Sequence, residues 1–286
     1  MTGLLAQVLN GLQYGLLLFL ISSGLTLIFG VMGVINLAHG SLFMIGAYLA
    51  YVVAGATGQF WLALPAAIAG GLVFGALLER LLFRHFRERE HLDQVLLTFA
   101  LILLFEEARA ALIDNQFHAV PVPPALDFSV PVIGGFAYSA YRLAVLAICA
   151  AVAAAMTMVV AWTRFGAAIR AAAENPQMLD LLGFDARLIH TAVFAAGTAL
   201  AMLAGALAAP LQAVYPGMGD GFLILSFIVV VIGGLGSIAG AFWAALLVGL
   251  IDTLGKVYAP EVAGIAVCAL MALVLLWRPS GLFGRA

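Results

Sequence analysis

Charged residues are scarce in this sequence. Asp, Glu, Lys and Arg make up 9% of its 286 residues, whereas 65% of the residues are hydrophobic. A soluble globular chain has roughly 25% charged and about 45–50% apolar residues. The apolar excess therefore requires lipid as its solvent. The net charge of −2 and the lack of a long basic block give no sign of a nucleic-acid partner.

Cysteine is also rare. Cys149 and Cys268 lie inside apolar runs and are interpreted as small buried hydrophobic residues, not as a disulfide or a metal site. No His, Asp and Cys side chains recur at metal-ligand spacing, so neither a metal nor another cofactor is expected. Ser41 and His39 are two residues apart and do not share a helix face, so they form no nucleophile–base pair. The chain is not expected to be an enzyme.

A phosphate-binding loop is lacking as well. Gly249–Lys256 superficially resembles one, but five residues separate its two glycines where the pattern needs four. Val257 also stands where a magnesium-binding hydroxyl would be required. Any coupling to ATP therefore needs a partner protein.

Long apolar runs are what the sequence does contain. A helix crosses a hydrocarbon core of about 30 Å with about 20 apolar residues, and lipid-exposed backbone must satisfy its own hydrogen bonds. These runs lack the alternation of a transmembrane β-barrel. The prediction is an all-α bundle of nine transmembrane helices, or of eight if the glycine-rich Gly30–Gly46 is a broken helix. The nine predicted spans are Leu4–Phe29, Ala38–Ala56, Trp61–Phe83, Gln94–Ile113, Tyr141–Thr163, Leu188–Ala208, Phe222–Ile238, Ala241–Tyr258 and Val262–Trp277.

The first of these runs is expected to be a retained span. It has no Lys or Arg before it and is too long for the apolar region of a secretory signal. Residues 1–286 are expected to form a single transmembrane domain.

Basic residues predict the orientation. Nine of the 12 Lys and Arg residues fall in or beside two loops, about 84–93 and 164–187, or in the C-terminal tail. The positive-inside rule places both loops and the C-terminus in the cytoplasm. The loop at about 114–140 has no Lys or Arg and is expected outside. Three spans before Arg84 would place the N-terminus outside, whereas two would place it inside.

Small residues four apart predict close helix packing at Gly11/Gly15, Gly71/Gly75 and Gly236/Gly240. Gly33–Tyr48 and Gly236–Leu250 also resemble each other in being rich in small residues at the start of a span. Repeated halves are common in transporters, but this similarity is too weak to establish a repeat.

The segment Arg164–His190 is long for a connector and has helix-forming composition over Ala167–Glu174. Asn175-Pro176 can end that helix and begin a short second one over Gln177–Leu182, with Gly183 as its stop. Its charges surround apolar residues. Either a docking surface for another protein or a helix in the lipid interface would explain this pattern.

Polar residues inside predicted spans are the other candidates. Asn36, His39 and Ser41 can line a pathway or a gating kink, but hydrogen bonding within a broken helix is the favoured interpretation. Two pairs, Glu106/Arg109 and Asp252/Lys256, are three and four apart on a helix face. Packing, or outward extension of Lys256, is favoured over a role in a pathway.

Four separated motifs resemble the permeases of branched-chain amino acid ABC importers, specifically the shorter of the two paired permeases. They are Gly30–Ala50, the run Glu174-Asn175-Pro176 followed by Gly183-Phe184-Asp185, Gly233–Ile251, and Trp277–Gly284. The resemblance spans the whole chain. It implies two ATP-binding subunits, a second, related permease and an external solute-binding protein as partners. It also implies that Glu174, Asn175, Pro176, Gly183 and Asp185 contact the ATP-binding subunit, so that nucleotide-driven closure reaches the spans.

The expected function is thus that of a multi-pass permease subunit in the bacterial inner membrane. It would import small neutral or zwitterionic solutes, with branched-chain amino acids or related amides and carboxylates implied by the resemblance. The alternative is a gated channel or an ion-coupled transporter, in which Glu106, Glu107 and Asp252 would carry protons or ions. A folded docking segment argues against that alternative, because a channel has no need of one.

Overall fold

The computed structural model describes residues 2–87, 89–131, 137–174 and 185–284. Its helices are α1 (Thr2–Met32), α2 (His39–Thr57), α3 (Ala63–Leu78), α4 (Arg84–Phe86), α5 (His91–Leu112), α6 (Ala140–Trp162), α7 (Arg164–Glu174), α9 (Ala186–Ala208), α10 (Met218–Gly233), α11 (Ile238–Tyr258) and α12 (Ala263–Trp277). Short 3-10 turns lie at Phe60–Leu62 and Pro124–Leu126, and a π-helical turn, Glu79–Phe83, continues α3.

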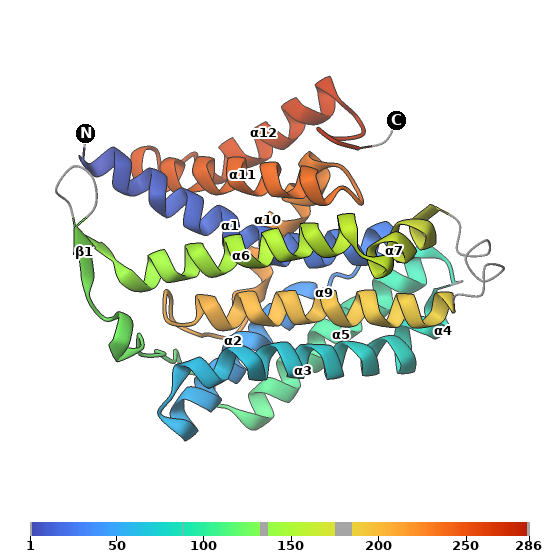
Figure 1. The fold of residues 1–286 in the computed structure, drawn as a ribbon, viewed down its shortest axis with the longest axis horizontal. Helices are drawn as coiled ribbons and strands as arrows, with labels where there is room; N and C mark the ends of the chain where they lie inside the picture. Colours follow the sequence, from blue (N-terminus) through green and yellow to red (C-terminus); the bar gives the residue numbers. More distant parts are fainter. Residues whose placement is uncertain (1, 88, 132–136, 175–184, 285–286) are drawn as a thin grey trace.

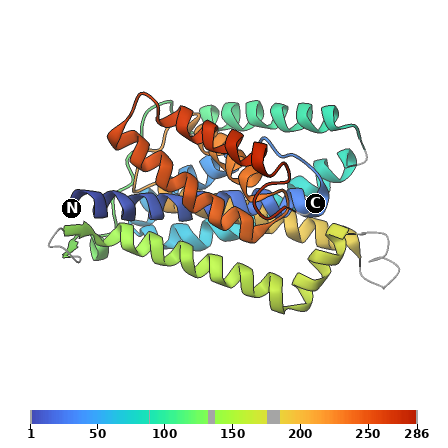
Figure 2. The same ribbon diagram turned by 90° about the horizontal axis from the view of Figure 1, so that it is seen from above.

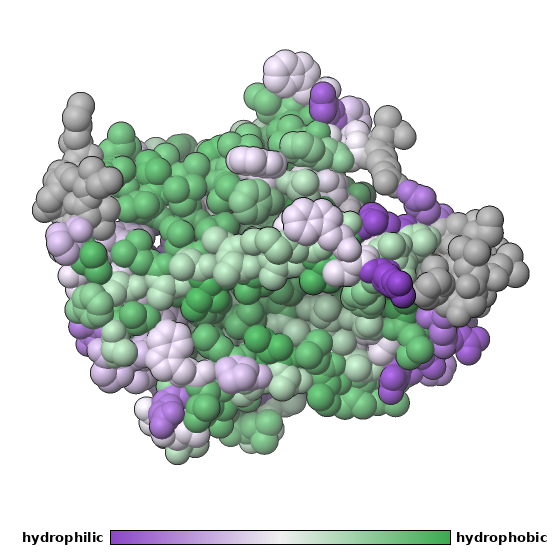
Figure 3. Space-filling view, in the orientation of Figure 1, coloured by the Kyte–Doolittle hydropathy of each residue, from purple (hydrophilic) through white to green (hydrophobic). Residues whose placement is uncertain are grey.

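All nine predicted spans are helices, so the all-α transmembrane bundle is confirmed. Within the described residues, six helices are long and apolar enough to cross a membrane, and α10 and α12 are shorter apolar helices. Apolar side chains also cover much of the surface. Figure 3 shows a hydrophobic middle with hydrophilic residues gathered at the two ends, as expected for a protein surrounded by lipid at mid-height.

The two ends of the bundle differ in charge. One end, here called the arginine-rich end, holds α4, α7, the start of α9 and the tail after α12 (Figure 1). Its described basic residues are Arg80, Arg84, Arg87, Arg89, Arg164, Arg170, Arg187 and Arg278. The other, here called the hairpin end, holds the start of α1 and the loop before α6. Three helices precede Arg84, and α1 begins at the opposite end from it, as the three-span prediction requires.

A small β-ribbon in the loop before α6 was not predicted from the sequence. Strands β1 (Ser129–Pro131) and β2 (Ala137–Ser139) pair antiparallel, with Val130 opposite Tyr138. Three-residue strands carry too little alternation to be recognised, and the prolines of the loop favour irregular extended backbone. The ribbon anchors the loop, because the Tyr138 hydroxyl donates a 3.0 Å hydrogen bond to Asn10 of α1.

Two helices begin inside the bundle instead of crossing it. The first residue of α2, His39, lies beside Ile21, which is more than halfway along α1. The first turn of α10 meets it there, because a Cβ atom on Gly40 would lie 2.5 Å from the Gly219 carbonyl oxygen. From this point α2 runs to the hairpin end and α10 runs to the arginine-rich end, where the Phe283 amide donates to the Gly233 carbonyl.

The helix contacts form two inverted halves. Helix α1 packs on α9 and α2 packs on α10. The contacts of α1 with α10 and α11 are matched by those of α9 with α2 and α3, and the contact of α10 with α12 is matched by that of α2 with α5. Inverted repeats of this kind, each with a discontinuous helix, recur in transporters. The sequence similarity of Gly33–Tyr48 to Gly236–Leu250 does not follow this repeat, which pairs α2 with α10 and not with α11.

Seen from above, α6 lies on one side of α1, while α5 and α12 lie on the other (Figure 2, green, blue, teal and red). Among the described residues, the extensive contacts of α6 are with α1, α7 and β2. Its remaining surface is largely exposed and apolar, as lipid contact requires.

The predicted glycine positions do allow close packing. A Cβ atom on Gly15 would lie 2.8 Å from the Ala245 carbonyl oxygen of α11, and one on Gly71 would lie 2.5 Å from the Ala199 Cα of α9. Helices α1 and α9 cross at Gly24 and Gly197, where an added Cβ on Gly24 would lie 2.6 Å from the Gly197 carbonyl oxygen. Backbone-to-backbone contact of this kind holds membrane helices together in the absence of a hydrophobic driving force.

Candidate functional site

The arginine-rich end contains the segment predicted to dock a partner. Helix α7 includes the predicted helix Ala167–Glu174 and starts three residues earlier, at Arg164. Glu174 ends α7, and Asp185 precedes α9. Asn175, Pro176 and Gly183 lie outside the described residues, as does the predicted short helix Gln177–Leu182.

Helix α7 is fixed firmly to the bundle. Its buried face, which includes Ala168, Ile169 and Ala172, packs in one apolar cluster with Leu27 of α1 and Ile189 of α9. Its charged residues lie on the opposite, exposed face. The turn from α6 is tight, because a Cβ atom on Gly166 would overlap the Val160 carbonyl oxygen and the Arg170 guanidinium donates to that same oxygen. Movement of α7 would therefore displace α1 and α9.

Asp185 caps the first turn of α9. Its carboxylate accepts a 2.9 Å hydrogen bond from the Arg187 backbone amide. An aspartate at this position satisfies one of the free amides at a helix N-terminus and interacts favourably with the helix dipole. Asp185 therefore fixes the position at which α9 starts.

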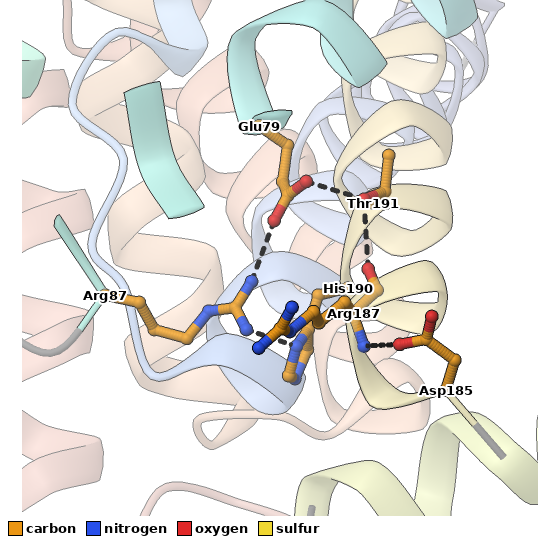
Figure 4. A network of polar contacts seen from close by, with 6 residues as sticks. All are labelled: Glu79, Arg87, Asp185, Arg187, His190 and Thr191. Carbon is orange, nitrogen blue, oxygen red and sulfur yellow. Dashed lines mark hydrogen bonds and ion pairs between the residues drawn. The ribbon is translucent and has the colours of Figure 1, made fainter. Parts of the chain in front are cut away.

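A buried carboxylate joins the same part of α9 to α3 and α4 (Figure 4). Glu79 lies in the π-helical turn after α3 and is fully buried. Arg87 forms a 2.7 Å ion pair with one of its oxygens, and the Thr191 hydroxyl donates a 2.6 Å hydrogen bond to the other. The Arg87 guanidinium also lies 2.6 Å from Nδ1 of His190. We call these four residues the Glu79 network.

The three predicted pathway residues lie at the junction of α1 and α2, with Asn36 in the break and His39 and Ser41 in the first turn of α2. Gly33 ends α1 with φ +66°, a conformation that glycine adopts readily, and its amide donates to the Phe29 carbonyl. Asn36, His39 and Ser41 are all buried behind it. Nε2 of His39 lies 3.0 Å from the Ile21 carbonyl oxygen, so it carries the proton and donates.

Two buried polar atoms at this break have no hydrogen-bond partner within the described part of the chain. They are Oδ1 of Asn36 and Nδ1 of His39. Because Nε2 of His39 is the donor, its Nδ1 is an acceptor, and both atoms therefore require a donor. The bond to Ile21 joins the start of α2 to α1, and each of the two acceptors can take a hydrogen bond from a water or a solute.

Comparison with known proteins covers nearly the whole chain. Residues 7–275 match the family model "Branched-chain amino acid transport system / permease component". The chain is 31% identical to the permease protein BraD of a high-affinity branched-chain amino acid transport system from Pseudomonas aeruginosa, over 98% of this chain and 96% of that protein. It is 30% identical to LivH of Escherichia coli K12, with the same coverage, and 27% identical to a probable LivH permease of Methanocaldococcus jannaschii, over 97% and 92%. No solved structure matches the chain.

The chain belongs to this permease family. It is a multi-pass membrane protein and a permease component, as the four sequence motifs predicted.

Two ion pairs of the permease lie within helices near the hairpin end. Arg109 forms a 3.2 Å ion pair with Glu106, and Lys256 forms a 2.6 Å ion pair with Asp252, as their spacings predicted. Glu106 additionally accepts a 2.9 Å hydrogen bond from the Gly217 amide, which begins α10. Glu107 is exposed. The hydrogen bond of Glu106 to Gly217 joins α5 to the start of α10.

The Glu79 network was missed in the sequence, where Arg87 counted only toward orientation. One signal was present, because a carboxylate inside a predicted apolar span is costly unless it is paired. Its partners were not identifiable, since His190 and Thr191 lie more than 100 residues away. Within the described residues, no group of three or more His, Cys, Asp or Glu side chains could hold a metal ion.

Proposed function

We propose that the chain is the membrane-spanning subunit of an ATP-driven importer for branched-chain amino acids in the bacterial inner membrane. The relatives that match it end to end are permeases of such systems by name. By the same similarity, the complete importer holds a second, related permease, two ATP-binding subunits and an external solute-binding protein. The chain itself supplies no ATPase site, and residues 1–286 act as a single permease domain.

The arginine-rich end faces the cytoplasm in this proposal, and the C-terminus lies there too. Eight of the 11 Lys and Arg residues that the structure describes lie at this end. Basic residues in short loops are retained on the cytoplasmic side during insertion. The hairpin end, with the N-terminus and the β-ribbon, then faces the binding protein.

The ATP-binding subunit docks on the segment between α7 and α9, through Glu174, Asn175, Pro176, Gly183 and Asp185. The observation that carries this assignment is the Glu79 network. It ties the first two turns of α9 to the turn after α3 by the hydrogen bond from Thr191 to Glu79, and to Arg87 by the contact of its guanidinium with His190. Force applied to the docking segment would therefore move α3 and α9 together instead of unwinding one helix end.

The centre of the bundle is the proposed gate. Asn36, His39 and Ser41 lie where the first turns of α2 and α10 meet. Discontinuous helices are the elements that line the substrate path in other transporters with inverted repeats. Rocking of the two halves would open and close the contact between Gly40 and Gly219.

Reconstitution of the complete importer tests the function. The permease, its partner permease and the ATP-binding subunits would be placed in liposomes, with binding protein and labelled leucine on one side and ATP on the other. The proposal expects uptake that requires both ATP and the binding protein. A permease that purifies without an ATP-binding subunit, and that conducts solute without ATP, would contradict it and favour the channel or ion-coupled transporter.

A further inference from the structure

A polar cavity of about 490 Å³ opens at the hairpin end and reaches the start of α10, where Met218, Gly221 and Phe222 line it. It lies between α1, α6, α10, α11 and the connection that follows α9. This volume is within the range of about 300–1,000 Å³ that small-molecule sites occupy. The hydrogen-bonding and charged side chains that line it include Asn10, Gln13, Arg142, Gln212, Asp252 and Lys256.

Arg142 supplies a cation to this cavity. Its guanidinium donates to Oδ1 of Asn10 at 3.4 Å and to Oε1 of Gln13 at 3.3 Å, and both acceptors are neutral. Among the residues that the structure describes, the ion pairs do not include Arg142. An arginine held by amide oxygens keeps its charge and several N–H donors for an added carboxylate.

Gln212 adds a donor without an acceptor. Its Nε2 atom is buried and has no hydrogen-bond partner in the described chain. Leaving a buried N–H group unpaired costs free energy, so such a group is usually satisfied by a ligand or a water. Gln212 and Arg142 line the same cavity. Together they provide donors suited to one anionic group.

Asp252 provides the opposite charge. Its side chain is only 7% exposed, and one of its oxygens pairs with Lys256, whose side chain is 60% exposed and lies over the Tyr14 ring. An exposed lysine gains little from such a pair and can move into water. The carboxylate can therefore exchange Lys256 for another ammonium group.

The cavity also has an apolar wall, formed by Leu17, Leu211, Met218, Phe222 and Leu225. We propose that it binds an α-amino acid as a zwitterion. The ligand carboxylate would meet Arg142 and Gln212, its ammonium group would meet Asp252, and its aliphatic side chain would lie on this wall. Anions alone would be repelled by Asp252, and cations alone by Arg142. This inference rests on the proposed function, since the cavity would be a binding site for the amino acid that the binding protein releases.

Binding to the permease complex without the binding protein tests the site. Labelled leucine would be measured on the purified complex of both permeases and the ATP-binding subunits by scintillation proximity. 4-Methylpentanoate, which lacks the ammonium group, and 3-methylbutylamine, which lacks the carboxylate, would serve as competitors. Leucine should bind at least tenfold more tightly than either analogue, because only leucine satisfies both charges.

Three variants separate the roles. Arg142→Gln and Asp252→Asn should each weaken leucine binding at least tenfold, and Asp252→Asn should bind 4-methylpentanoate no more weakly than wild type does. Lys256→Gln frees Asp252 and should strengthen binding of 3-methylbutylamine, a gain that no folding defect produces. Glu261→Gln is the matched control, because Glu261 is an exposed acid in the turn before α12 and does not line the cavity.

The results distinguish the site from the function. If the wild-type complex imports leucine but does not bind it without the binding protein, or if all the variants bind leucine as wild type does, the cavity proposal is wrong and the proposed function stands. If the complete wild-type importer hydrolyses ATP but takes up no branched-chain amino acid, the proposed function falls, and binding of another zwitterion in competition assays would still support the site.

Discussion

The Glu79 carboxylate and the Thr191 hydroxyl join α3 to α9 through a 2.6 Å hydrogen bond in the interior of the bundle. These residues are 112 positions apart. Thr191 lies in the second turn of α9, which Asp185 caps, and Glu79 lies in the π-helical turn that ends α3. π-Helical turns within helices often mark functional positions. Helices α3 and α9 are thereby held in one register near the start of α9.

Removing the charge at Glu79 should destabilise the permease. Glu79→Gln leaves Arg87 without its carboxylate, and breaking a buried ion pair costs roughly 3–5 kcal/mol. The Arg87 side chain is 22% exposed and can recruit water, so we expect a loss of about 2 kcal/mol. Thr191→Val removes the hydroxyl that Glu79 and the Arg187 carbonyl share as a donor, and should cost about 1 kcal/mol. Both losses would appear as lower midpoints of thermal unfolding in detergent.

Glu90→Gln is the control for this series, because Glu90 is an exposed acid at the same end of the bundle. If the unfolding midpoint is unchanged in Glu79→Gln, or falls equally in Glu90→Gln, the Glu79 network does not hold α3 to α9.

A second prediction concerns Gly46, where α2 lies close to α9. A Cβ atom on Gly46 would overlap the Met202 carbonyl oxygen, whereas one on Gly55, in the same helix, would meet open space. Gly46→Ala should therefore separate the helices and lower the yield of folded permease, together with its unfolding midpoint. Gly55→Ala should be neutral or stabilise by about 0.5–1 kcal/mol, because alanine favours the helix. Equal behaviour of the two variants would contradict the packing at Gly46.

Much of the fold was predictable because an apolar run identifies a transmembrane helix without information from the rest of the chain. Each apolar run, such as Tyr141–Thr163, must become a helix whatever its neighbours are. The inverted halves were not predictable, since the contact of Gly40 with Gly219 depends on two segments that share no obvious sequence. The sequence also indicated a break near Gly33 but not that α2 starts beside Ile21.

Some contacts of the candidate site were likewise predictable from the sequence, and others were not. Pairs within one helix, such as Asp252 and Lys256, followed from their spacing. Arg142 carried no local signal, because its partners lie on another helix, more than 120 residues away. Glu79 was recognisable only as a carboxylate in an apolar run, and its function as a link to α9 required the structure.

Substitutions in the segment between α7 and α9 should uncouple transport from ATP hydrolysis without removing the permease from the membrane. Glu174→Lys reverses a charge at the end of α7, and Gly183→Val replaces a glycine that the family motif places at the stop of the docking helix. Both variants should reach the membrane in normal amounts, but leucine uptake per ATP hydrolysed should fall at least tenfold. The measurement is uptake and phosphate release from the same liposomes.

Glu261→Lys makes the matched charge reversal at the opposite end and should leave that ratio unchanged. Normal uptake by both docking-segment variants would remove the coupling assignment, whereas failure to reach the membrane would point to a folding role for these residues.

The hydrogen bond of His39 predicts a different result for two substitutions. Gln can place its amide nitrogen near the position of Nε2 and donate to the Ile21 carbonyl, whereas Leu cannot. His39→Leu should therefore lower stability by about 1 kcal/mol, and His39→Gln should retain most of it. If His39 also serves the gate, the maximal uptake rate should fall in both variants while stability falls in one. Full uptake by His39→Gln would restrict His39 to the structural role.

Orientation can be tested with single cysteines. After Cys149 and Cys268 are replaced by alanine, Arg89→Cys and Asp127→Cys place thiols at exposed positions on the arginine-rich end and in the loop before α6. A membrane-impermeant maleimide should modify Asp127→Cys in intact spheroplasts and Arg89→Cys only after permeabilisation, because basic loops remain in the cytoplasm. The reverse pattern would place α7 and Asp185 outside the cell, where no ATP-binding subunit could reach them. Both the proposed orientation and the proposed coupling role of Glu174 and Gly183 would then be wrong, whatever effect their substitution has on uptake.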